Sequence, residues 1–347
     1  MLNLNKFNYV YNMLEDDISR KVFDYRLEFA VNHNWHIFLE LFDYWDSVLD
    51  EFAGFYERYK LPIMIFGIDR DAVYVSRTLC KLGYTVKGFF RYNVNLGNML
   101  EDLPVIDFAE TRHYKGDYLI FLASTRFTDK MYSSCLHMPN IDRDKIFYPM
   151  KKRYCIFTPR QYFDFFEPRE HEVFVDAGAY DGETSIEFSK WASKGYDMIY
   201  LFEPDTNNEN VCRDNLEAHH IEHYELHMQG TGEQEKSVLF AGMSMPGSCI
   251  SEDGESIAEI TTLDHVLNGR DVTFIKLDVE GCEAESLLGA KNTIARCSPR
   301  MAICAYHHPW DFVNLPLLVK ELSSDYHVAL RHYTTGERET VLYAWKE

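Results

Sequence analysis

Acidic and histidine side chains follow two apolar runs in the C-terminal half of the chain. FIKLDVEGCE ends in Asp278, Glu280 and Glu283, and MAICAYHHPWDF carries His307 directly after its apolar residues. Clustered carboxylates can hold a substrate hydroxyl, act as a base or bind a hard cation. His307 next to Asp278 would form a pair in which one side chain orients the other for removing a proton from a hydroxyl. We therefore predict Asp278 and His307 as catalytic residues.

These side chains could also have a purely structural role or bind a metal. Polar residues are common in the loops that follow strands, so His307 could be an ordinary loop residue. Asp278, Glu280 and His307 could instead bind a divalent metal, although oxygen and nitrogen ligands of this kind suit several metals or none. We do not expect a metal, and this set stays an alternative.

A possible cofactor loop lies earlier in the chain, in VFVDAGAYDG. A dinucleotide-binding turn needs the pattern G-x-G-x-x-G, in which the second glycine lets the pyrophosphate approach the backbone. Counting from Gly178, the second and third glycine positions hold Tyr180 and Glu183. A bulky ring and a carboxylate at these positions would obstruct or repel a pyrophosphate. The loop therefore disfavours a dinucleotide.

The residues that remain in this loop suit a different ligand. Asp176 could hold an ammonium group, and the turn through Gly178 and Gly182 leads to Thr184 near the start of a helix, whose N–H groups favour a carboxylate. S-adenosylmethionine carries both groups at its methionine end. We predict these four residues as cofactor-binding, with a purely structural turn as the alternative.

A single carboxylate, Glu203, ends the next apolar run, YLFEPD. It lies about 20 residues beyond the glycine loop, where an acidic side chain holds the hydroxyls of a ribose. We predict that Glu203 binds the ribose of the cofactor. A solvated glutamate at the end of a strand is the alternative.

The elements that must position these residues alternate between strands and helices. Apolar runs predict strands, and helices are expected to start near Thr184, Asn208, Glu283 and Leu315. Alternation of this kind is typical of a parallel sheet covered by helices. A Gly/Ser-rich excursion over 230–262 is too long for a plain loop and predicts a β-hairpin or a lid. The predicted strands are 173–177, 198–203, 223–229, 272–278, 301–306, 327–333 and 339–345.

The N-terminal half predicts a second, smaller α/β domain. Strands are expected in 63–72, 85–91, 103–110, 117–124 and 145–149, with a helix over 71–83 that Gly83 closes. Its first loop, Gly67 to Ala72, keeps only the first glycine of a dinucleotide pattern, and Asp69 would repel a pyrophosphate. A non-catalytic scaffold is favoured over a working NAD site. The predicted division is a helical segment (1–60), a small Rossmann-like domain (61–150), a connector (151–171) and the cofactor-binding domain (172–347).

Several ordered motifs over about residues 160–347 resemble the FkbM family of S-adenosylmethionine-dependent methyltransferases. They are VFVDAGAYDG, YLFEPD, TTLDHVL, FIKLDVEGCEAESLLGA, AYHHPWDF and LRHYTTGERETVLYAW. The resemblance implies a class I methyltransferase sheet of seven strands with an antiparallel last strand. It also implies that Asp176, Gly178 and Gly182 surround the methionine part of the cofactor and that Glu203 contacts the ribose.

The same resemblance implies further positions. Gly230 and Thr231 would lie near the adenine, and Asp278 near the methyl group that is transferred. Members of the family usually methylate oxygen on sugars or natural products. This chain departs from the commoner DVGANxG form, because Tyr180 replaces the Asn. The small N-terminal domain resembles the Rossmann-like module that accompanies bacterial surface-sugar enzymes.

Composition limits the partners. The 347 residues carry a formal net charge of −20, which would repel nucleic acid or an anionic membrane. The first residues lack the basic start and apolar run of a signal peptide, and no apolar stretch is long enough to span a membrane. The eight cysteines include no C-x-x-C pair. We expect a cytoplasmic protein, with homo-oligomerisation through the N-terminal helices as a possibility.

Together, these patterns predict an S-adenosylmethionine-dependent methyltransferase. The expected reaction is O-methylation of a hydroxyl on a small-molecule or glycan acceptor, such as a saccharide or a saccharide-containing metabolite. One alternative is an NAD(P)-dependent oxidoreductase that acts on a sugar nucleotide, and another is a non-catalytic ligand-binding regulator.

Overall fold

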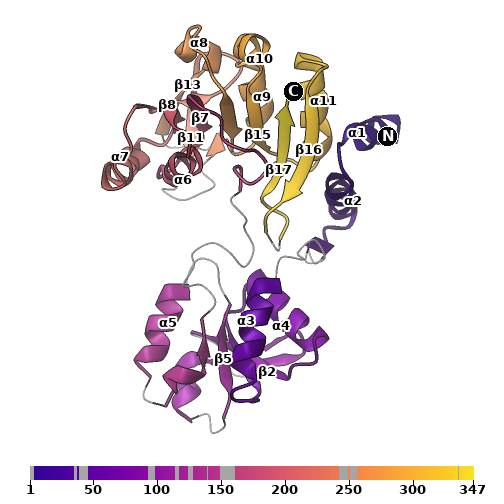
Figure 1. The fold of residues 1–347 in the computed structure, drawn as a ribbon, viewed down its shortest axis with the longest axis vertical. Helices are drawn as coiled ribbons and strands as arrows, with labels where there is room; N and C mark the ends of the chain where they lie inside the picture. Colours follow the sequence, from indigo (N-terminus) through magenta and orange to yellow (C-terminus); the bar gives the residue numbers. More distant parts are fainter. Residues whose placement is uncertain are drawn as a thin grey trace. The chain divides into compact units, whose positions relative to one another are not determined.

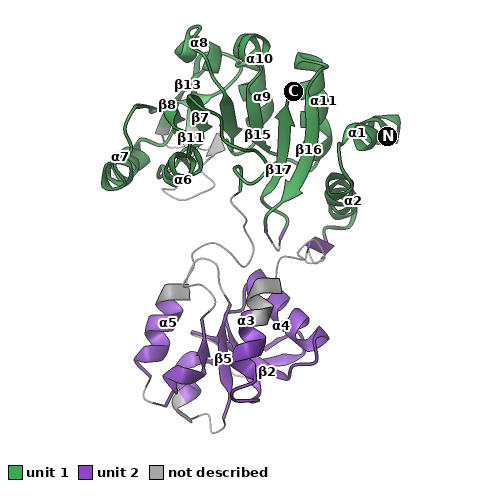
Figure 2. Ribbon diagram, viewed as in Figure 1, with its two compact units in different colours: residues 1–33, 160–333, 337–347 green, residues 34–159, 334–336 purple. Residues whose placement is uncertain are grey.

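A computed structural model of the chain divides it into two compact units, which Figure 2 shows in different colours. Unit 1 comprises residues 1–33, 160–333 and 337–347, and unit 2 comprises residues 34–159 and 334–336. The residues that the structure describes are 4–34, 37–38, 46–92, 98–113, 117–123, 128–138, 140–148, 161–241, 249–250, 256–334 and 336–347.

Unit 1 is built on a seven-stranded sheet (Figure 1). Its strand order is β16-β17-β15-β14-β7-β8-β9, and β17 runs antiparallel to both of its neighbours. This confirms the predicted seven strands and the antiparallel last strand. The strands are β7 (Glu172–Ala177), β8 (Tyr196–Phe202), β9 (Tyr224–His227), β14 (Phe274–Leu277), β15 (Arg300–Cys304), β16 (His327–His332) and β17 (Thr340–Trp345).

Helices connect these strands. The helices after β7, β8 and β14 begin at Glu183, Glu209 and Glu283, each within one residue of the predicted start. The one after β15 begins at Asp311, four residues before the predicted Leu315. The helices are α6 (Glu183–Trp191), α7 (Glu209–Ala218), α8 (Leu263–Leu267), α9 (Glu283–Leu288), α10 (Lys291–Cys297) and α11 (Asp311–Leu322).

Aromatic rings fill the core between α6 and the sheet. Phe174 of β7 stacks on Phe188 of α6 with 4.3 Å between ring centroids, and Phe274 of β14 packs against Trp191. Strands β14 and β15 are buried along their whole length, as expected for parallel strands covered on both faces. This rigid centre positions the loops at the strand ends.

The excursion between β9 and β14 folds into a small sheet of its own. Its order is β10-β13-β11-β12, and β11 pairs antiparallel with both β12 and β13. The sequence predicted a β-hairpin or a lid here, and the structure shows a sheet of four strands. They are β10 (Gly230–Thr231), β11 (Lys236–Ala241), β12 (Cys249–Ile250) and β13 (Ser256–Thr261).

The predicted helical segment over 1–60 is divided between the two units. Helices α1 (Leu4–Met13) and α2 (Asp17–Asn32) belong to unit 1, whereas α3 (Asp46–Tyr56) belongs to unit 2. Asp16 accepts a hydrogen bond from Ser19 N at the start of α2 and forms an ion pair of 2.9 Å with Arg331 of β16. Periodicity along the sequence predicts helices but not their partners, so it does not predict this division.

Aromatic contacts hold the two N-terminal helices to unit 1. Phe23 of α2 lies edge-on to Phe312 of α11 at 5.1 Å, and Phe7 of α1 lies edge-on to Trp310 at 5.6 Å. The buried side of these helices is therefore used within the chain. A homo-oligomer through them stays a prediction.

Unit 2 has a six-stranded sheet in the order β3-β4-β2-β1-β5-β6. Core clusters lie on both sides of it, one with Phe52 of α3 and the other with Cys135 of α5, so the sheet is covered on both faces. Only the short β3 is antiparallel to its neighbour. The elements are β1 (Ile63–Phe66), α4 (Arg70–Lys81), β2 (Val86–Arg91), β3 (Met99–Leu100), β4 (Leu103–Asp107), β5 (Leu119–Leu122), α5 (Thr128–Leu136) and β6 (Ile146–Phe147).

Residues 151–160 of the predicted connector lie outside the described part of the chain. None of the helices in the described ranges is long and apolar enough to cross a membrane.

Replacing Phe23 by alanine tests whether α2 is part of unit 1. Phe23 is 2% exposed, so the cavity left in its place should lower the free energy of unfolding of unit 1 by about 3–5 kcal/mol. Urea denaturation followed by tryptophan fluorescence measures this change. Ile18→Ala on the same helix is the matched control, because Ile18 is 54% exposed and should change stability by no more than about 0.5 kcal/mol. Equal stability of the two variants would contradict the packing of α2.

Candidate active site

Four of the predicted site residues, Glu203, Gly178, Asp278 and His307, follow the carboxyl ends of four neighbouring parallel strands, β8, β7, β14 and β15. Backbone hydrogen bonds join the loops at this edge. Gly178 N donates to Phe202 O at 2.9 Å, and Asp278 N donates to Ala177 O at 3.1 Å. The loops after β7, β8 and β14 are therefore held in contact, and ligands of open α/β sheets bind at such an edge.

The turn after β7 requires glycine at its first position. Gly178 has φ +78°, and a Cβ atom there would lie only 1.8 Å from the carbonyl oxygen of Asp278. Gly182 has φ +79°, and a Cβ there would lie 3.0 Å from Cys212 Sγ. Gly178 thus allows the β7 loop to pass directly over the end of β14.

Asp176 has a different immediate partner from the one predicted. Its side chain is fully buried; one oxygen accepts from Lys276 Nζ at 3.0 Å and the other from Ser185 Oγ at 2.7 Å. The ammonium group that Asp176 was expected to take from a ligand is supplied by Lys276 of β14. Asp176 therefore holds the loop in place.

Lys276 was missed in the sequence, although a lysine within the apolar run FIKLD is a signal of a buried charge. Its ammonium also donates to Ala177 O and to Gly178 O, the latter at 2.6 Å. Burial lowers the pKa of Lys276, but the charges of Asp176 and Asp278 outweigh burial and raise it above its usual value. Lys276 therefore remains a cation beneath the loop.

Tyr180 lies in the left-handed region with φ +48°. Asn adopts this conformation more readily than other residues with side chains. The backbone conformation by itself therefore accounts for the Asn of the commoner DVGANxG form at this position. The backbone N–H of Tyr180 donates to Glu203 Oε2 at 2.9 Å. Because the donor is a backbone group, this hydrogen bond connects the loop to β8 with Tyr in place of Asn at position 180.

Glu203 is 5% exposed and lies where it was predicted, directly after β8. Its other oxygen accepts from Asp205 N at 2.8 Å and from Asn208 Nδ2 at 3.2 Å. Burial raises the pKa of Glu203 above its usual value, although these hydrogen bonds act to lower it. Protein donors thus fix the orientation of the carboxylate.

The remaining predicted cofactor residues lie on neighbouring elements. A Cβ built on Gly230 would lie 3.5 Å from Pro204 Cβ, so β10 begins beside the residue that follows Glu203. Thr231 is buried, and its hydroxyl lies 2.6 Å from Ser286 Oγ. Thr184 is half-buried in the first turn of α6, while the adjacent Ser185 makes the contact with Asp176.

Asp278 lies among several hydrogen-bond donors. The Tyr162 hydroxyl donates to Oδ2 at 3.0 Å and the Tyr306 hydroxyl to Oδ1 at 3.4 Å. Burial raises the pKa of Asp278, but the charges of Lys276 and His307 prevail and lower it. Tyr162, from the segment before β7, was missed because nothing in its local sequence points to Asp278.

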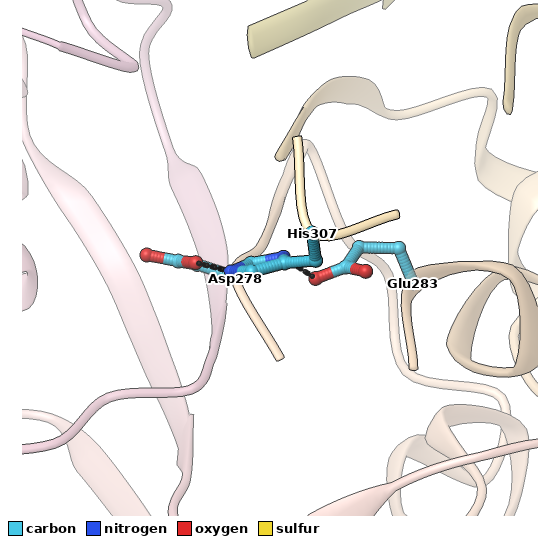
Figure 3. Close-up of side chains that lie close together, drawn as sticks. All are labelled: Asp278, Glu283 and His307. Carbon is cyan, nitrogen blue, oxygen red and sulfur yellow. Dashed lines mark hydrogen bonds and ion pairs between the residues drawn. The ribbon is translucent and has the colours of Figure 1, made fainter. Parts of the chain in front are cut away.

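His307 lies between Asp278 and Glu283 (Figure 3). Its Nδ1 is 2.8 Å from Glu283 Oε1, and its Nε2 is 3.5 Å from Asp278 Oδ1 and 3.4 Å from Glu280 Oε2. Burial lowers the pKa of His307, but the hydrogen bond and charge of Glu283, with the other two carboxylates, raise it to about 9. The predicted His307–Asp278 pair therefore forms, with Glu283 as the residue that orients the ring.

Glu283 was in the acidic cluster recognised in the sequence but was not predicted as a site residue. It is 1% exposed and also accepts from Val279 N at 2.9 Å. Glu283 therefore connects the loop after β14 to His307.

The corresponding loop of unit 2 packs closely on its neighbours and caps the next helix with a carboxylate. A Cβ on Gly67 would lie 2.4 Å from Ala123 O, and the Asp69 carboxylate accepts from Ala72 N at 3.2 Å in the first turn of α4. A carboxylate thus lies at the helix start that a phosphate would need.

Gly178→Ala tests the close approach of the two loops. A positive φ and the contact with Asp278 O together should lower the free energy of unfolding of unit 1 by about 3 kcal/mol or more. Gly269→Ala is the matched control, since Gly269 has φ +82° but nothing within 4 Å of a built Cβ; it should cost about 1 kcal/mol. Urea denaturation of both variants measures the difference, and similar losses would show that the loops are not in contact.

The comparison with solved structures gives matches of low identity. The crystal structure of methyltransferase FkbM from Methylobacillus flagellatus KT is 17% identical, with 95% of this chain and 99% of that chain covered and a TM-score of 0.47. An rRNA methylase from Streptococcus thermophilus is 16% identical over 52% of this chain and 89% of its own, with a TM-score of 0.35. A SAM-dependent methyltransferase from Aquifex aeolicus is 13% identical over 54% and 89%, with a TM-score of 0.34.

A search of curated proteins gives no significant match. The family comparison, in contrast, matches residues 176–336 to the methyltransferase FkbM domain. The match begins at Asp176 and includes Glu203, Asp278 and His307. Residues 176–336, a little under half of this chain, are therefore similar to the methyltransferase FkbM domain.

Proposed function

We propose that this methyltransferase uses S-adenosylmethionine to methylate a hydroxyl group on a saccharide or a saccharide-containing metabolite. The observation that carries the proposal is the arrangement at one sheet edge of an FkbM domain. There Glu203, the Gly178 loop and Asp278 are connected by hydrogen bonds and follow adjacent strands. The three groups suit the ribose, the methionine part and the reacting methyl, in that order.

The cofactor side of the site fits this ligand in two respects. Gly182 has no side chain to cap α6, and Asp181 Oδ1 accepts from the first N–H, that of Glu183, at 3.1 Å, so the next N–H groups of the first turn would receive a carboxylate. Glu203 Oε2 accepts from Tyr180 N, and a carboxylate oxygen can accept more than one hydrogen bond. Bound S-adenosylmethionine would supply a methyl group on a sulfonium centre, from which an oxygen nucleophile can displace it.

Asp278 would receive the proton of the acceptor hydroxyl. Its side chain is 25% exposed, compared with 10% for His307, so a substrate can reach Asp278 more directly. Tyr162 and His307 hold the carboxylate from the protein side. His307 would then position Asp278, and alignment of hydroxyl and methyl would provide much of the rate acceleration.

A polyhydroxylated acceptor suits the charges next to this position. Glu280 is 37% exposed in its side chain and lies on the same side of His307 as Asp278. Two accessible carboxylates can accept hydrogen bonds from vicinal hydroxyls. The formal net charge of −20 makes a polyanionic acceptor unfavourable.

Two other functions predict different binding behaviour. An NAD(P)-dependent oxidoreductase should bind nicotinamide cofactor, whereas Tyr180 and Asp69 lie where a pyrophosphate would have to approach. A non-catalytic regulator on this fold should show no methyl transfer. Mass spectrometry of the purified protein for S-adenosylhomocysteine distinguishes the first of these from the proposal.

Glu203→Gln tests the cofactor site. An amide cannot accept hydrogen bonds through both of its end groups, so it would face a backbone N–H with an NH2 group and offer the ribose a weaker acceptor. Calorimetry should show an affinity for S-adenosylmethionine that is lower by about 10- to 100-fold. Asp197→Asn, at the opposite end of β8 and 58% exposed, is the control and should bind normally. Unchanged binding by Glu203→Gln would remove Glu203 from the site.

Asp278→Asn tests the acceptor side. Loss of the proton acceptor should lower kcat for methyl transfer by about 10²- to 10⁴-fold, with binding of S-adenosylmethionine retained within a few-fold of the unchanged protein. A radiolabelled methyl-transfer screen over glycans measures this. Asp271→Asn, at the amino end of β14 and 89% exposed, is the control. Full activity of Asp278→Asn would exclude it as the proton acceptor.

A further inference from the structure

Unit 2 has a cavity of about 460 Å³ at the carboxyl ends of two strands of its sheet. Tyr92 follows β2 directly and Phe108 follows β4 directly, and these two strands are parallel neighbours. Ligands of open α/β sheets bind at such an edge, and ligand cavities typically have volumes of about 300–1,000 Å³. The first loop of unit 2, Gly67 to Ala72, does not line this cavity, so the lost glycine pattern of that loop does not bear on it.

One wall of the cavity is aromatic. Phe108 is buried and stacks on Phe66 of β1 with 4.3 Å between ring centroids. Tyr92 lies edge-on to Phe108 at 5.3 Å and is 40% exposed. The Tyr92 ring is thus held by buried rings and still accessible, and an aromatic face of this kind can stack on a flat ring of a ligand.

A second wall is polar and comes from one face of α5 (Figure 1). Lys130, Ser133, Ser134 and His137 are three or four residues apart along this helix and its end, so they lie on the same side. Burial raises the pKa of Tyr92, although a hydrogen bond with Ser134 acts to lower it. The aromatic wall and the polar wall therefore meet at this contact.

The polar wall has basic groups and exposed donors. Lys130 is exposed, and no ion pair joins it to a carboxylate within the described ranges. His137 Nδ1 lies 2.6 Å from Ser133 O. Because a carbonyl oxygen only accepts, Nδ1 carries a proton, and Nε2 is the ring nitrogen that is left for a ligand. The Ser133 hydroxyl is exposed on the same face.

Acidic residues are absent from the part of the cavity wall that the structure describes. Asp107 and Glu110 flank Phe108 in the sequence but do not line the cavity. The whole chain, in contrast, has a formal net charge of −20. A local group of basic side chains in an acidic protein favours an anion at that position, and a lysine ammonium with hydroxyl donors suits a phosphate.

We propose that this cavity binds a small molecule that carries both a ring and a phosphate group. The ring would stack on Tyr92, and the phosphate would accept hydrogen bonds from the Lys130 ammonium and the Ser133 hydroxyl. A nucleotide and a sugar phosphate share these two groups, and binding measurements distinguish them. The site belongs to unit 2 and does not rest on the proposed function.

Calorimetry with the full-length chain tests the cavity. Cytidine monophosphate and glucose 1-phosphate are the two probes, and neither contains the adenine that unit 1 is proposed to bind. At least one of them should bind as one molecule per chain. Its phosphate-free counterpart, cytidine or glucose, should bind at least about 10-fold more weakly, because it lacks the charged partner of Lys130. Binding of one probe alone identifies the ligand class.

Two substitutions locate the binding in this cavity. Lys130→Ala should weaken binding of the probe by at least about 10-fold, and Tyr92→Ala by about 5- to 100-fold. Lys87→Ala is the matched control, because Lys87 is also an exposed lysine of unit 2 but lies near the amino end of β2; it should bind normally. Since Lys130 is exposed, Lys130→Ala remains informative if Tyr92→Ala fails to fold.

Three results would overturn the proposal. Absence of binding by both probes, or equal binding by the Lys130 and Lys87 variants, would remove the site. Inorganic phosphate that binds as tightly as the better probe would exclude the contact between Tyr92 and a ring. Cytidine or glucose that binds as tightly as its phosphate ester would exclude the contact between Lys130 and a phosphate.

Discussion

The buried ion pair between Lys276 and Asp176 is the contact on which the site depends. It joins β14 to β7 where both strands end, and the same ammonium binds Ala177 O and Gly178 O. Removing either partner would leave an uncompensated buried charge, which is strongly destabilising. The pair therefore determines the path of the loop after β7 and, two residues beyond Lys276, the position of Asp278.

From this pair, hydrogen bonds extend along the sheet edge in both directions. Toward β8, Tyr180 N connects the loop to Glu203. Toward β15, Asp278 faces His307, which Glu283 holds from behind. The groups that we propose for the cofactor and those that we propose for the acceptor thus share one support, and displacement of the loop at Gly178 would affect both.

Unit 2 has a similar α/β architecture with a different first loop. Its first loop packs tightly at Gly67, and Asp69 places a carboxylate at the start of α4. In unit 1, the corresponding turn ends in Gly182, which has no side chain to cap α6. Asp181 Oδ1 accepts from Glu183 N at 3.1 Å, so a carboxylate lies at the start of α6 as well, and the two turns differ in which residue supplies it.

The sequence by itself determined the strands of unit 1, the antiparallel last strand and the loops that carry Gly178, Glu203, Asp278 and His307. The strands and loops follow from apolar runs, glycine spacing and motif order, which are local properties, whereas the antiparallel last strand is what the resemblance to the FkbM family implies. Only the tertiary structure decided that Lys276 neutralises Asp176, that Tyr162 binds Asp278, that Glu283 orients His307 and that α2 packs on β16. Several of these partners are about a hundred or more residues apart, and all of them depend on which strands are neighbours and which way their ends point. Spacing along the chain does not contain that information, because the packing of the whole sheet sets it.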